Sequence, residues 1–218
     1  MSDIVFSSPK FLHWKNRVEK NNVIITNIDV LGVISRDQIS LFSAFLDCKF
    51  LTPEGIEINR YVLLGGESVV IIPVFNCIED KETYTLMVEQ RRVVDGNFTV
   101  EFPAGGIDLM KDNPKTAACR ELKEELGIII EQEELISISK EQVKTSPSFS
   151  DELVNFFYFK REVTLSYLKK LNGQRTGCND EGEFIRIKLM KINQVVNCMT
   201  SSALIGINLL ERKLNCKF

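Results

Sequence analysis

The chain has 218 residues, and its 44% hydrophobic content is ample for a sizeable core, so we expect one compact domain with a short N-terminal extension. Its 27 Lys and Arg residues nearly balance 30 Asp and Glu residues, and no long run carries a single sign of charge, which argues against a nucleic-acid partner. We find neither an apolar run of membrane-spanning length nor a secretory signal pattern, and therefore expect a cytoplasmic protein without a membrane partner.

Cysteine and histidine usage narrows the chemistry. His13 is the only histidine, and no C-x-x-C pair occurs among the six cysteines, Cys48, Cys77, Cys119, Cys178, Cys198 and Cys216. A Cys/His zinc site cannot be assembled from these residues, and we expect reduced thiols. Because a His-based nucleophilic triad would have to use His13 near the start of the chain, acid–base chemistry is expected to fall to carboxylates.

The N-terminal region predicts a short helix and a small β unit. The helix is expected around Pro9 to Lys20, and two runs rich in β-branched and aromatic residues, 23–35 and 41–51, are typical of strands. Trp14 is expected in the core rather than at a binding site. We assign residues 1–60 to this extension and residues 61–218 to the main domain.

The main domain begins with two apolar runs, 69–78 and 83–94, whose charged turn indicates a buried hairpin. A glycine-containing loop over residues 101–113 then leads to Asn113 and Pro114, which suit the N-cap and the first position of a helix. That helix should run to about Leu126 and end at Gly127. Further strands are predicted over 128–140, 152–163 and 183–190, and further helices over 165–171 and 204–214. Strands mixed with helices favour an α/β layered sandwich.

The predicted helix carries three carboxylates on one side. Glu121 lies three residues before Glu124 and four before Glu125, so the side chains project from adjacent positions. Like charges at these spacings destabilise a helix by roughly 0.2–0.5 kcal/mol per pair. A divalent cation would remove this repulsion, and Mg²⁺ prefers oxygen ligands. The alternative is a solvated acidic face balanced by Arg120 and Lys123.

The spacing around these carboxylates resembles the Nudix box. Gly106 is followed by five residues, Asp112, seven residues, Arg120-Glu121-Leu122, one residue, Glu124-Glu125, one residue and Gly127-Ile128. Asp112 departs from the pattern, which normally has Glu there. In a second alignment Gly105 is the box glycine, with one residue inserted before the helix.

The resemblance extends on both sides of the box and covers about residues 60 to 215. The segment VEQRRVVDGNFTVEFPAGGID is similar to the corresponding strand and loop of ADP-ribose and ADP-sugar pyrophosphatases. SPSFSDE is similar to their S-P-G-x-x-D-E loop, with Ser148 in place of Gly, and EGEFIRIKLM is similar to the strand that follows in plant-type ADP-sugar diphosphatases. The resemblance implies a Nudix α/β/α sandwich with a mixed sheet. It also implies a homodimer in which the N-terminal strands of residues 1–60 help to build the partner's site.

The resemblance further implies a metal site on the helix. Glu121 and Glu125 are the implied ligands, together with Glu124 and the backbone carbonyl of Ala104. Mg²⁺ is the expected ion, with Mn²⁺ as the alternative. Arg120 is expected to orient the carboxylates through charge-assisted hydrogen bonds.

Other site residues follow from the flanking segments. Glu152 is the candidate general base, with Asp151 as the substitute, and the alternative is that this segment is only a polar turn. Arg92 would hold a substrate phosphate, which suits a guanidinium, unless it is an ordinary strand-end charge. Glu101 would contact the substrate ribose or a second metal.

These features predict metal-dependent hydrolysis of the diphosphate bond of an ADP-sugar, ADP-ribose or ADP-glucose, to AMP and a sugar 1-phosphate. One alternative is a Nudix diphosphatase for another nucleoside diphosphate derivative, such as UDP-glucose, NADH or a modified nucleotide. Another is a non-catalytic nucleotide-binding module. Such modules usually lack one of the three box glutamates, whereas this chain retains Glu121, Glu124 and Glu125.

Overall fold

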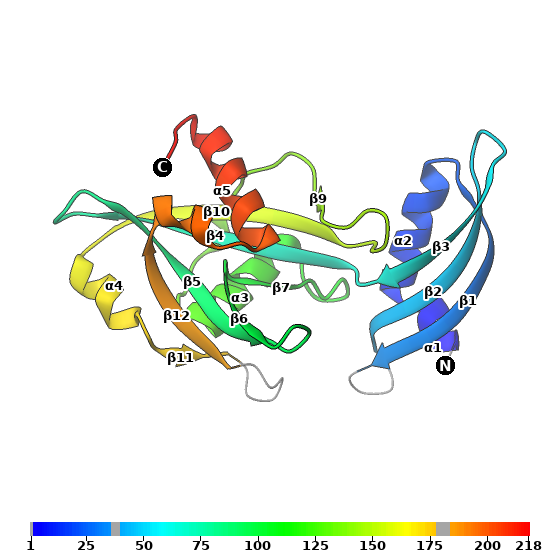
Figure 1. Ribbon diagram of the computed structural model, residues 1–218, viewed down its shortest axis with the longest axis horizontal. Helices are drawn as coiled ribbons and strands as arrows, with labels where there is room; N and C mark the ends of the chain where they lie inside the picture. The colour runs from blue at the N-terminus through cyan, green and yellow to red at the C-terminus, as the bar shows by residue number, and fades with distance from the viewer. Residues whose placement is uncertain (1, 36–39, 178–183) are drawn as a thin grey trace. The chain divides into compact units, whose positions relative to one another are not determined.

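The computed structural model describes residues 2–35, 40–177 and 184–218, which form two compact units (Figure 1). The first unit comprises the chain up to residue 67 together with residues 108–111 and 144–154. The second comprises residues 68–107, 112–143 and 155–218. None of the helices in these ranges is both long and apolar enough to cross a membrane.

The first unit is a three-stranded antiparallel sheet covered by two helices. The sheet has the order β1 (Ile24–Ser35), β2 (Leu41–Leu51), β3 (Glu57–Leu64), and the helices are α1 (Ser2–Phe6) and α2 (Pro9–Lys20). The Ser8 side chain caps α2 by accepting a hydrogen bond from the backbone N–H of Phe11. Trp14 is buried with Phe11 against the apolar face of the sheet, so its predicted place in the core is confirmed.

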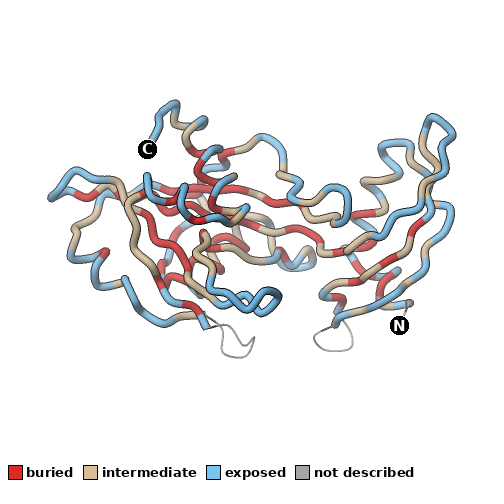
Figure 2. The backbone as a smooth tube through the Cα atoms, viewed as in Figure 1, coloured by how far each residue is buried: buried red, intermediate tan, exposed pale blue. Residues whose placement is uncertain are grey.

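The second unit is built on one larger sheet, which has nine strands among the described residues. Its main path runs β11-β12-β5-β4-β10-β8, while β6 pairs with β5, β7 with β4 and β9 with β10. The strands are β4 (Glu67–Cys77), β5 (Thr83–Arg92), β6 (Asn97–Glu101), β7 (Ala104–Gly106), β8 (Ile136–Ser137), β9 (Val143–Lys144), β10 (Leu153–Val163), β11 (Arg175–Thr176) and β12 (Ile185–Lys191). The predicted β4–β5 hairpin is confirmed, and both β4 and β10 are largely buried (Figure 2). Glu183, where the last strand was predicted to begin, lies outside the described residues.

Helices lie on this sheet as the α/β/α prediction requires. They are α3 (Pro114–Leu126), α4 (Leu165–Leu171) and α5 (Ser201–Leu214), with 3₁₀ turns η1 (Gln132–Glu134) and η3 (Ile192–Asn197). In Figure 1, α3 lies behind the sheet and α5 in front of it. Gly206 lets α5 approach closely, because a Cβ there would lie 3.1 Å from the Phe102 ring. The mixed α/β fold class is confirmed.

The predicted strand over residues 128–140 is wrong for most of its length. After α3 the chain runs without regular structure to the η1 turn, and only Ile136 and Ser137 pair as a strand. Ile128 and Ile130 are buried while Ile129 is exposed, which imitates a strand pattern. However, the Ile129 carbonyl accepts its hydrogen bond from Arg161 Nη2, at 3.2 Å, where a strand would have a backbone donor.

Candidate active site

Local sequence signals fix the ends of α3 and therefore the direction of its side chains. The Asn113 side chain accepts hydrogen bonds from the N–H groups of Lys115 and Thr116, and Pro114 occupies the first turn. Gly127 ends the helix with φ at +66°, a left-handed conformation that glycine adopts without strain. Leu122 and Leu126 are fully buried, so the carboxylates on the adjoining side face the β7 segment.

Gly105 provides the surface on which Glu121 lies. In β7, Gly105 pairs with Val69 of β4. A Cβ at Gly105 would be 1.9 Å from Oε1 of Glu121, whereas a Cβ at Gly106 would meet nothing within 4 Å. Only a glycine at position 105 therefore allows the carboxylate to rest on the backbone. The steric requirement for glycine therefore falls on Gly105, the box glycine of the second alignment, and not on Gly106.

Glu125 is the second buried carboxylate of the helix. Only 4% of the residue is exposed, compared with 8% for Glu121. The Ala104 N–H donates to Glu125 Oε2 at 3.0 Å, so the same short strand contacts both carboxylates. At the end of the helix, the Thr176 hydroxyl donates to the Glu125 carbonyl at 2.6 Å and Gly177 N–H donates to the Glu124 carbonyl at 3.3 Å.

Arg120 binds the acidic groups around it. Its Nη1 lies 2.7 Å from Glu121 Oε1 and 3.3 Å from Glu124 Oε2. Its Nη2 donates to the Gly106 carbonyl at 2.9 Å and to Asp112 Oδ2 at 3.4 Å. Burial tends to lower the pKa of Arg120, but Glu121, Glu124 and Asp112 raise that pKa above its usual value. Asp112, the residue that departs from the box pattern, still supplies a carboxylate to Arg120.

The donor set fits a hard divalent cation. Glu121, Glu124 and Glu125 offer only oxygen ligands, and a Mg²⁺ ion that keeps several waters needs few protein ligands. Among the described residues, no group of three or more Asp, Glu, His or Cys side chains is already arranged as a metal site. Arg120 binds Glu121 and Glu124 here, and Ala104 N–H binds Glu125. The side chains are therefore of the right kind but are held by protein donors.

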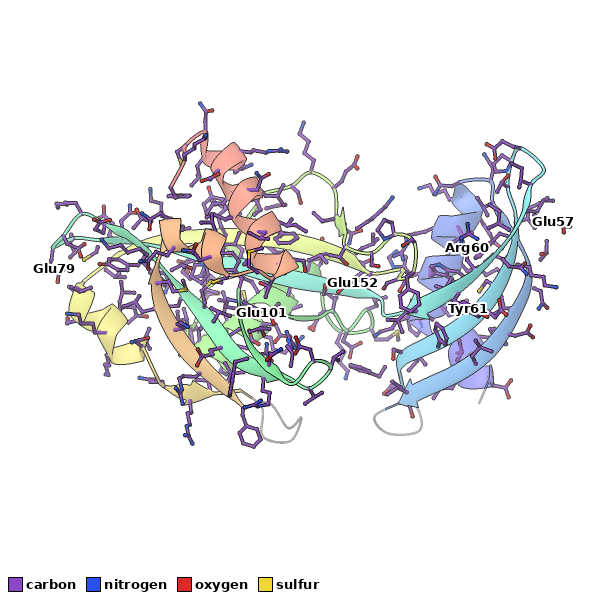
Figure 3. The ribbon with its side chains drawn as sticks, viewed as in Figure 1. Glu57, Arg60, Tyr61, Glu79, Glu101 and Glu152 are labelled. Atoms are coloured by element: carbon purple, nitrogen blue, oxygen red, sulfur yellow. The ribbon has the colours of Figure 1, made fainter. Side chains whose placement is uncertain are left out.

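Arg92 and Glu101 are brought together as a bidentate ion pair between β5 and β6. Arg92 Nε and Nη2 each lie 2.8 Å from one oxygen of Glu101, which also accepts from the Thr99 hydroxyl. Glu101 is labelled in Figure 3. Burial tends to raise the pKa of Glu101, but the hydrogen bonds from Arg92 and Thr99 lower that pKa below its ordinary value. The substrate contacts foreseen for Arg92 and Glu101 stay predictions.

Asp151 and Glu152 belong to the first unit and differ sharply in environment. The Asp151 side chain is only 1% exposed; it accepts from the N–H groups of Gly65 and Gly66 and from Arg17. Glu152 accepts from the Thr145 hydroxyl, 2.6 Å from its Oε2, and is labelled in Figure 3. The role of Glu152 as general base stays a prediction. Neither Arg17 nor Thr145 was identified from the sequence, and no local pattern marks either residue.

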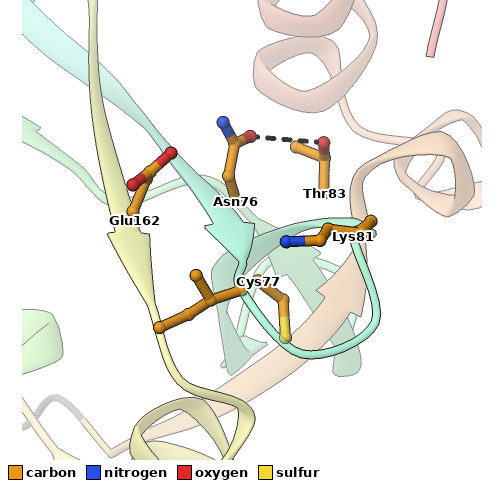
Figure 4. Close-up of a pocket in the computed structure, with 6 residues that line it drawn as sticks. Asn76, Cys77, Lys81, Thr83 and Glu162 are labelled. Carbon is orange, nitrogen blue, oxygen red and sulfur yellow. Dashed lines mark hydrogen bonds between the residues drawn. The ribbon is translucent and has the colours of Figure 1, made fainter.

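A separate hollow of about 310 Å³ lies at the far end of the β4–β5 hairpin (Figure 4). Its lining comprises Asn76, Cys77, Ile78, Lys81, Thr83 and Glu162. Gly105 pairs with Val69 near the other end of β4, seven residues or roughly 23 Å of strand away from Asn76. The hollow is therefore distinct from the carboxylate cluster. The Cys77 thiol in it donates to Glu79, and the five cysteines in the described ranges are free thiols, while Cys178 lies outside those ranges.

Comparison with known proteins identifies the family. The NUDIX domain model matches residues 67–205, which is more than half of the chain. The protein therefore belongs to the NUDIX domain family, and the resemblance of its box is confirmed.

Two relatives and one solved structure are similar to the chain. It is 28% identical over 180 residues to Nudix hydrolase 14, chloroplastic, of Arabidopsis thaliana, covering 79% of this chain and 56% of that protein. It is 32% identical over 145 residues to the methanol dehydrogenase activator of Bacillus methanolicus, covering 66% of this chain and 68% of that protein. The chain thus spans little more than half the length of the Arabidopsis relative. The crystal structure of an ADP compounds hydrolase matches with a TM-score of 0.61 at 17% identity, over 88% of this chain and 94% of that one, and shows the shared fold.

Proposed function

We propose that the protein hydrolyses the diphosphate bond of an ADP-sugar, ADP-ribose or ADP-glucose, in a reaction that depends on Mg²⁺ or Mn²⁺. The products would be AMP and a sugar phosphate. ADP-glucose would give the predicted sugar 1-phosphate, whereas ADP-ribose, whose diphosphate is attached at O5 of the ribose, would give ribose 5-phosphate. The main support is the pair of buried carboxylates, Glu121 and Glu125, that α3 places against Gly105 and Ala104. Membership of the NUDIX family and the names of two of the similar proteins, which describe hydrolases, support the same reaction class.

In this proposal the α3 carboxylates and the Ala104 carbonyl hold the cation. When bound, the ion would neutralise charge on the diphosphate and lower the pKa of a bound water. Glu121, Glu124 and Glu125 supply the carboxylate oxygens. Arg120 fixes the Glu121 and Glu124 side chains through its Nη1, and its contact with the Gly106 carbonyl ties the helix to the loop.

Glu152 is the proposed general base, which takes a proton from the attacking water at a side-chain oxygen. Asp151 is a poorer choice, because both of its oxygens are occupied in a buried network. Thr145 donates to Oε2 of Glu152 at 2.6 Å, which fixes the orientation of the carboxylate. Because its ordinary pKa is low, a carboxylate base depends on proximity to the water rather than on basicity.

Arg92 and Glu101 are the proposed substrate contacts. The guanidinium fork that holds Glu101 in a bidentate pair has the geometry that also suits a phosphate. Substrate phosphate would then share Arg92 with Glu101, and Glu101 would face the ribose. We also propose a cytoplasmic homodimer in which residues 1–60 supply the interface, with no nucleic-acid or membrane partner.

The test is a substrate panel with a matched variant. Phosphate release after phosphatase coupling would be measured with Mg²⁺ from ADP-ribose, ADP-glucose, UDP-glucose, NADH and nucleoside triphosphates, for the unsubstituted protein and Glu125→Gln. Turnover of ADP-sugars that collapses in the variant supports the proposal. Preference for UDP-glucose or NADH would replace the substrate class, and binding of nucleotides without any turnover would indicate a non-catalytic module.

A further inference from the structure

The loop that carries Glu152 is fastened to α2 by Arg17. Nη2 of Arg17 donates to both the backbone carbonyl and the Oδ2 of Asp151, each at 3.0 Å. The two residues are 134 positions apart in the chain, and both belong to the first unit. The Asp151 side chain is 1% exposed and that of Arg17 is 27% exposed, so this ion pair is largely removed from water. Breaking a buried pair leaves an uncompensated charge, which is costly.

The same loop is also held by backbone hydrogen bonds along the end of β3. Leu63 N–H donates to the Phe149 carbonyl at 2.8 Å, and Asp151 N–H donates to the Leu63 carbonyl at 3.2 Å. The N–H groups of Gly65 and Gly66 donate to Asp151 Oδ1 at 2.7 and 3.0 Å. These contacts fix the backbone up to the residue that directly precedes Glu152.

Arg17 also lies near a carboxylate at the start of β4. Nη1 of Arg17 lies 3.7 Å from Oε1 of Glu67, which is also 3.1 Å from Nδ1 of His13. Arg17 therefore links α2 to two buried carboxylates, one at the start of β4 and one beside the proposed base. A side chain that only needed to stabilise α2 could use an exposed partner, as Lys15 does with Glu19.

We propose that Arg17 is a positioning residue for the reaction, which acts through Asp151 to set the backbone from which Glu152 projects. The inference rests on the proposed function, in which Glu152 is the general base. A small displacement of a reacting group is enough to slow a reaction strongly, so the loss should appear in kcat. Substrate affinity should change little, because Arg17 itself touches no substrate in this proposal.

A double-mutant cycle with ADP-ribose and Mg²⁺ tests this coupling. Arg17→Gln is expected to lower kcat about 10- to 100-fold. KM should stay within about threefold of the unsubstituted value. Glu152→Gln alone should lower kcat about 100-fold or more. In the Glu152→Gln background, Arg17→Gln should add less than about a twofold loss, since the group that Arg17 positions is already gone. The matched control is Lys15→Gln, which removes an exposed ion pair from the same helix and should leave kcat unchanged.

Milder variants keep the test informative if Arg17→Gln folds poorly. Arg17→Lys retains the charge and should recover part of kcat. Asp151→Asn keeps an acceptor for Gly65 and Gly66 and should reproduce the kcat loss, with faster hydrogen exchange of the loop amides. Full kcat in these variants, or losses that multiply with that of Glu152→Gln, would overturn the inference. A fully active Glu152→Gln protein overturns it too, but by removing the proposed base, so the two failures are distinguishable.

Discussion

Two pairs of adjacent acidic residues, Glu124–Glu125 on α3 and Asp151–Glu152 in the loop before β10, look alike in sequence and differ in structure. In each pair one member is buried, Glu125 at 4% exposure and Asp151 with a 1% exposed side chain. The Glu124 side chain, which neighbours Glu125, is 45% exposed. Sequence adjacency therefore says little about which acid is buried.

The surroundings of the buried member separate the two pairs. Asp151 is matched by the positive Arg17 and by two backbone N–H groups, which satisfies its charge. Glu125 lies one helical turn after another buried carboxylate, Glu121, and these like charges repel each other. Arg120 offsets part of this repulsion by binding Glu121 and Glu124, and in the proposed function a bound cation would offset more of it. The first arrangement suits a metal site and the second suits a structural anchor.

The largest expected effect is the loss of activity in Glu125→Gln. Removing a ligand that supports charge stabilisation by the metal should cost about 4 kcal/mol in the barrier, or about 10³-fold in kcat. Glu124→Gln should cost only about tenfold, because an exposed carboxylate is more easily replaced by water. Initial rates with ADP-ribose at saturating Mg²⁺ measure both. Equal losses in the two variants would remove the distinction between the buried and the exposed acid.

Asp151→Ala should destabilise the fold by about 3 kcal/mol, because it removes the nearer of the two buried carboxylates that Arg17 contacts. It also leaves the N–H groups of Gly65 and Gly66 without their acceptor. Urea unfolding measures this difference. The control is Glu152→Ala, which removes the hydrogen bond from the Thr145 hydroxyl and should lower stability by less than about 1 kcal/mol. A stable Asp151→Ala protein would argue against the anchor.

Gly105→Ala should lower kcat by about 10- to 100-fold, since the new Cβ must displace the Glu121 carboxylate. Gly106→Ala is the matched control, because a Cβ there would meet nothing within 4 Å. Rates measured across a Mg²⁺ titration should show that Gly105→Ala needs more metal for half-maximal activity. The idea fails if Gly106→Ala is the more damaging of the two.

The sequence was sufficient for α3 because its signals are local. Asn113, Pro114 and Gly127 mark the ends of the helix through their own backbone preferences, and the spacing of Glu121 and Glu125 then determines that they share a face. The apolar run after the helix led to the wrong strand prediction over residues 128–140. Ile128 and Ile130 are buried, but they do not pair as a strand. Helix α1 and strands β3, β6, β7, β9 and β11 were not foreseen, and all of these except β3 are short.

Contacts between distant parts of the chain could not be read from the sequence. The Arg17–Asp151 pair joins residues in α2 and in the loop before β10. No sequence pattern around either residue predicts the other as its partner. Likewise Arg92 and Glu101 were both selected as substrate contacts, but their ion pair follows from the register that places Val88 opposite Glu101 and Arg92 opposite Asn97. Register depends on turn geometry and burial over the whole hairpin rather than on either residue.

The smallest expected effect concerns the Arg92–Glu101 ion pair, in which the Arg92 side chain is about half exposed. Since the pKa of Glu101 is lowered from 4.5 on folding, its stabilising contribution is present above that value and is lost as the pH falls through the lowered pKa. Glu101→Gln should therefore cost at most about 1 kcal/mol near pH 7, given the exposed Arg92, and less near pH 3. Urea unfolding at both pH values measures the difference, with Glu82→Gln as the control for an exposed pair, Glu82–Lys191, on the same sheet. A loss that stays the same at both pH values would mean that packing of Glu101, rather than its charge, stabilises the β5–β6 hairpin.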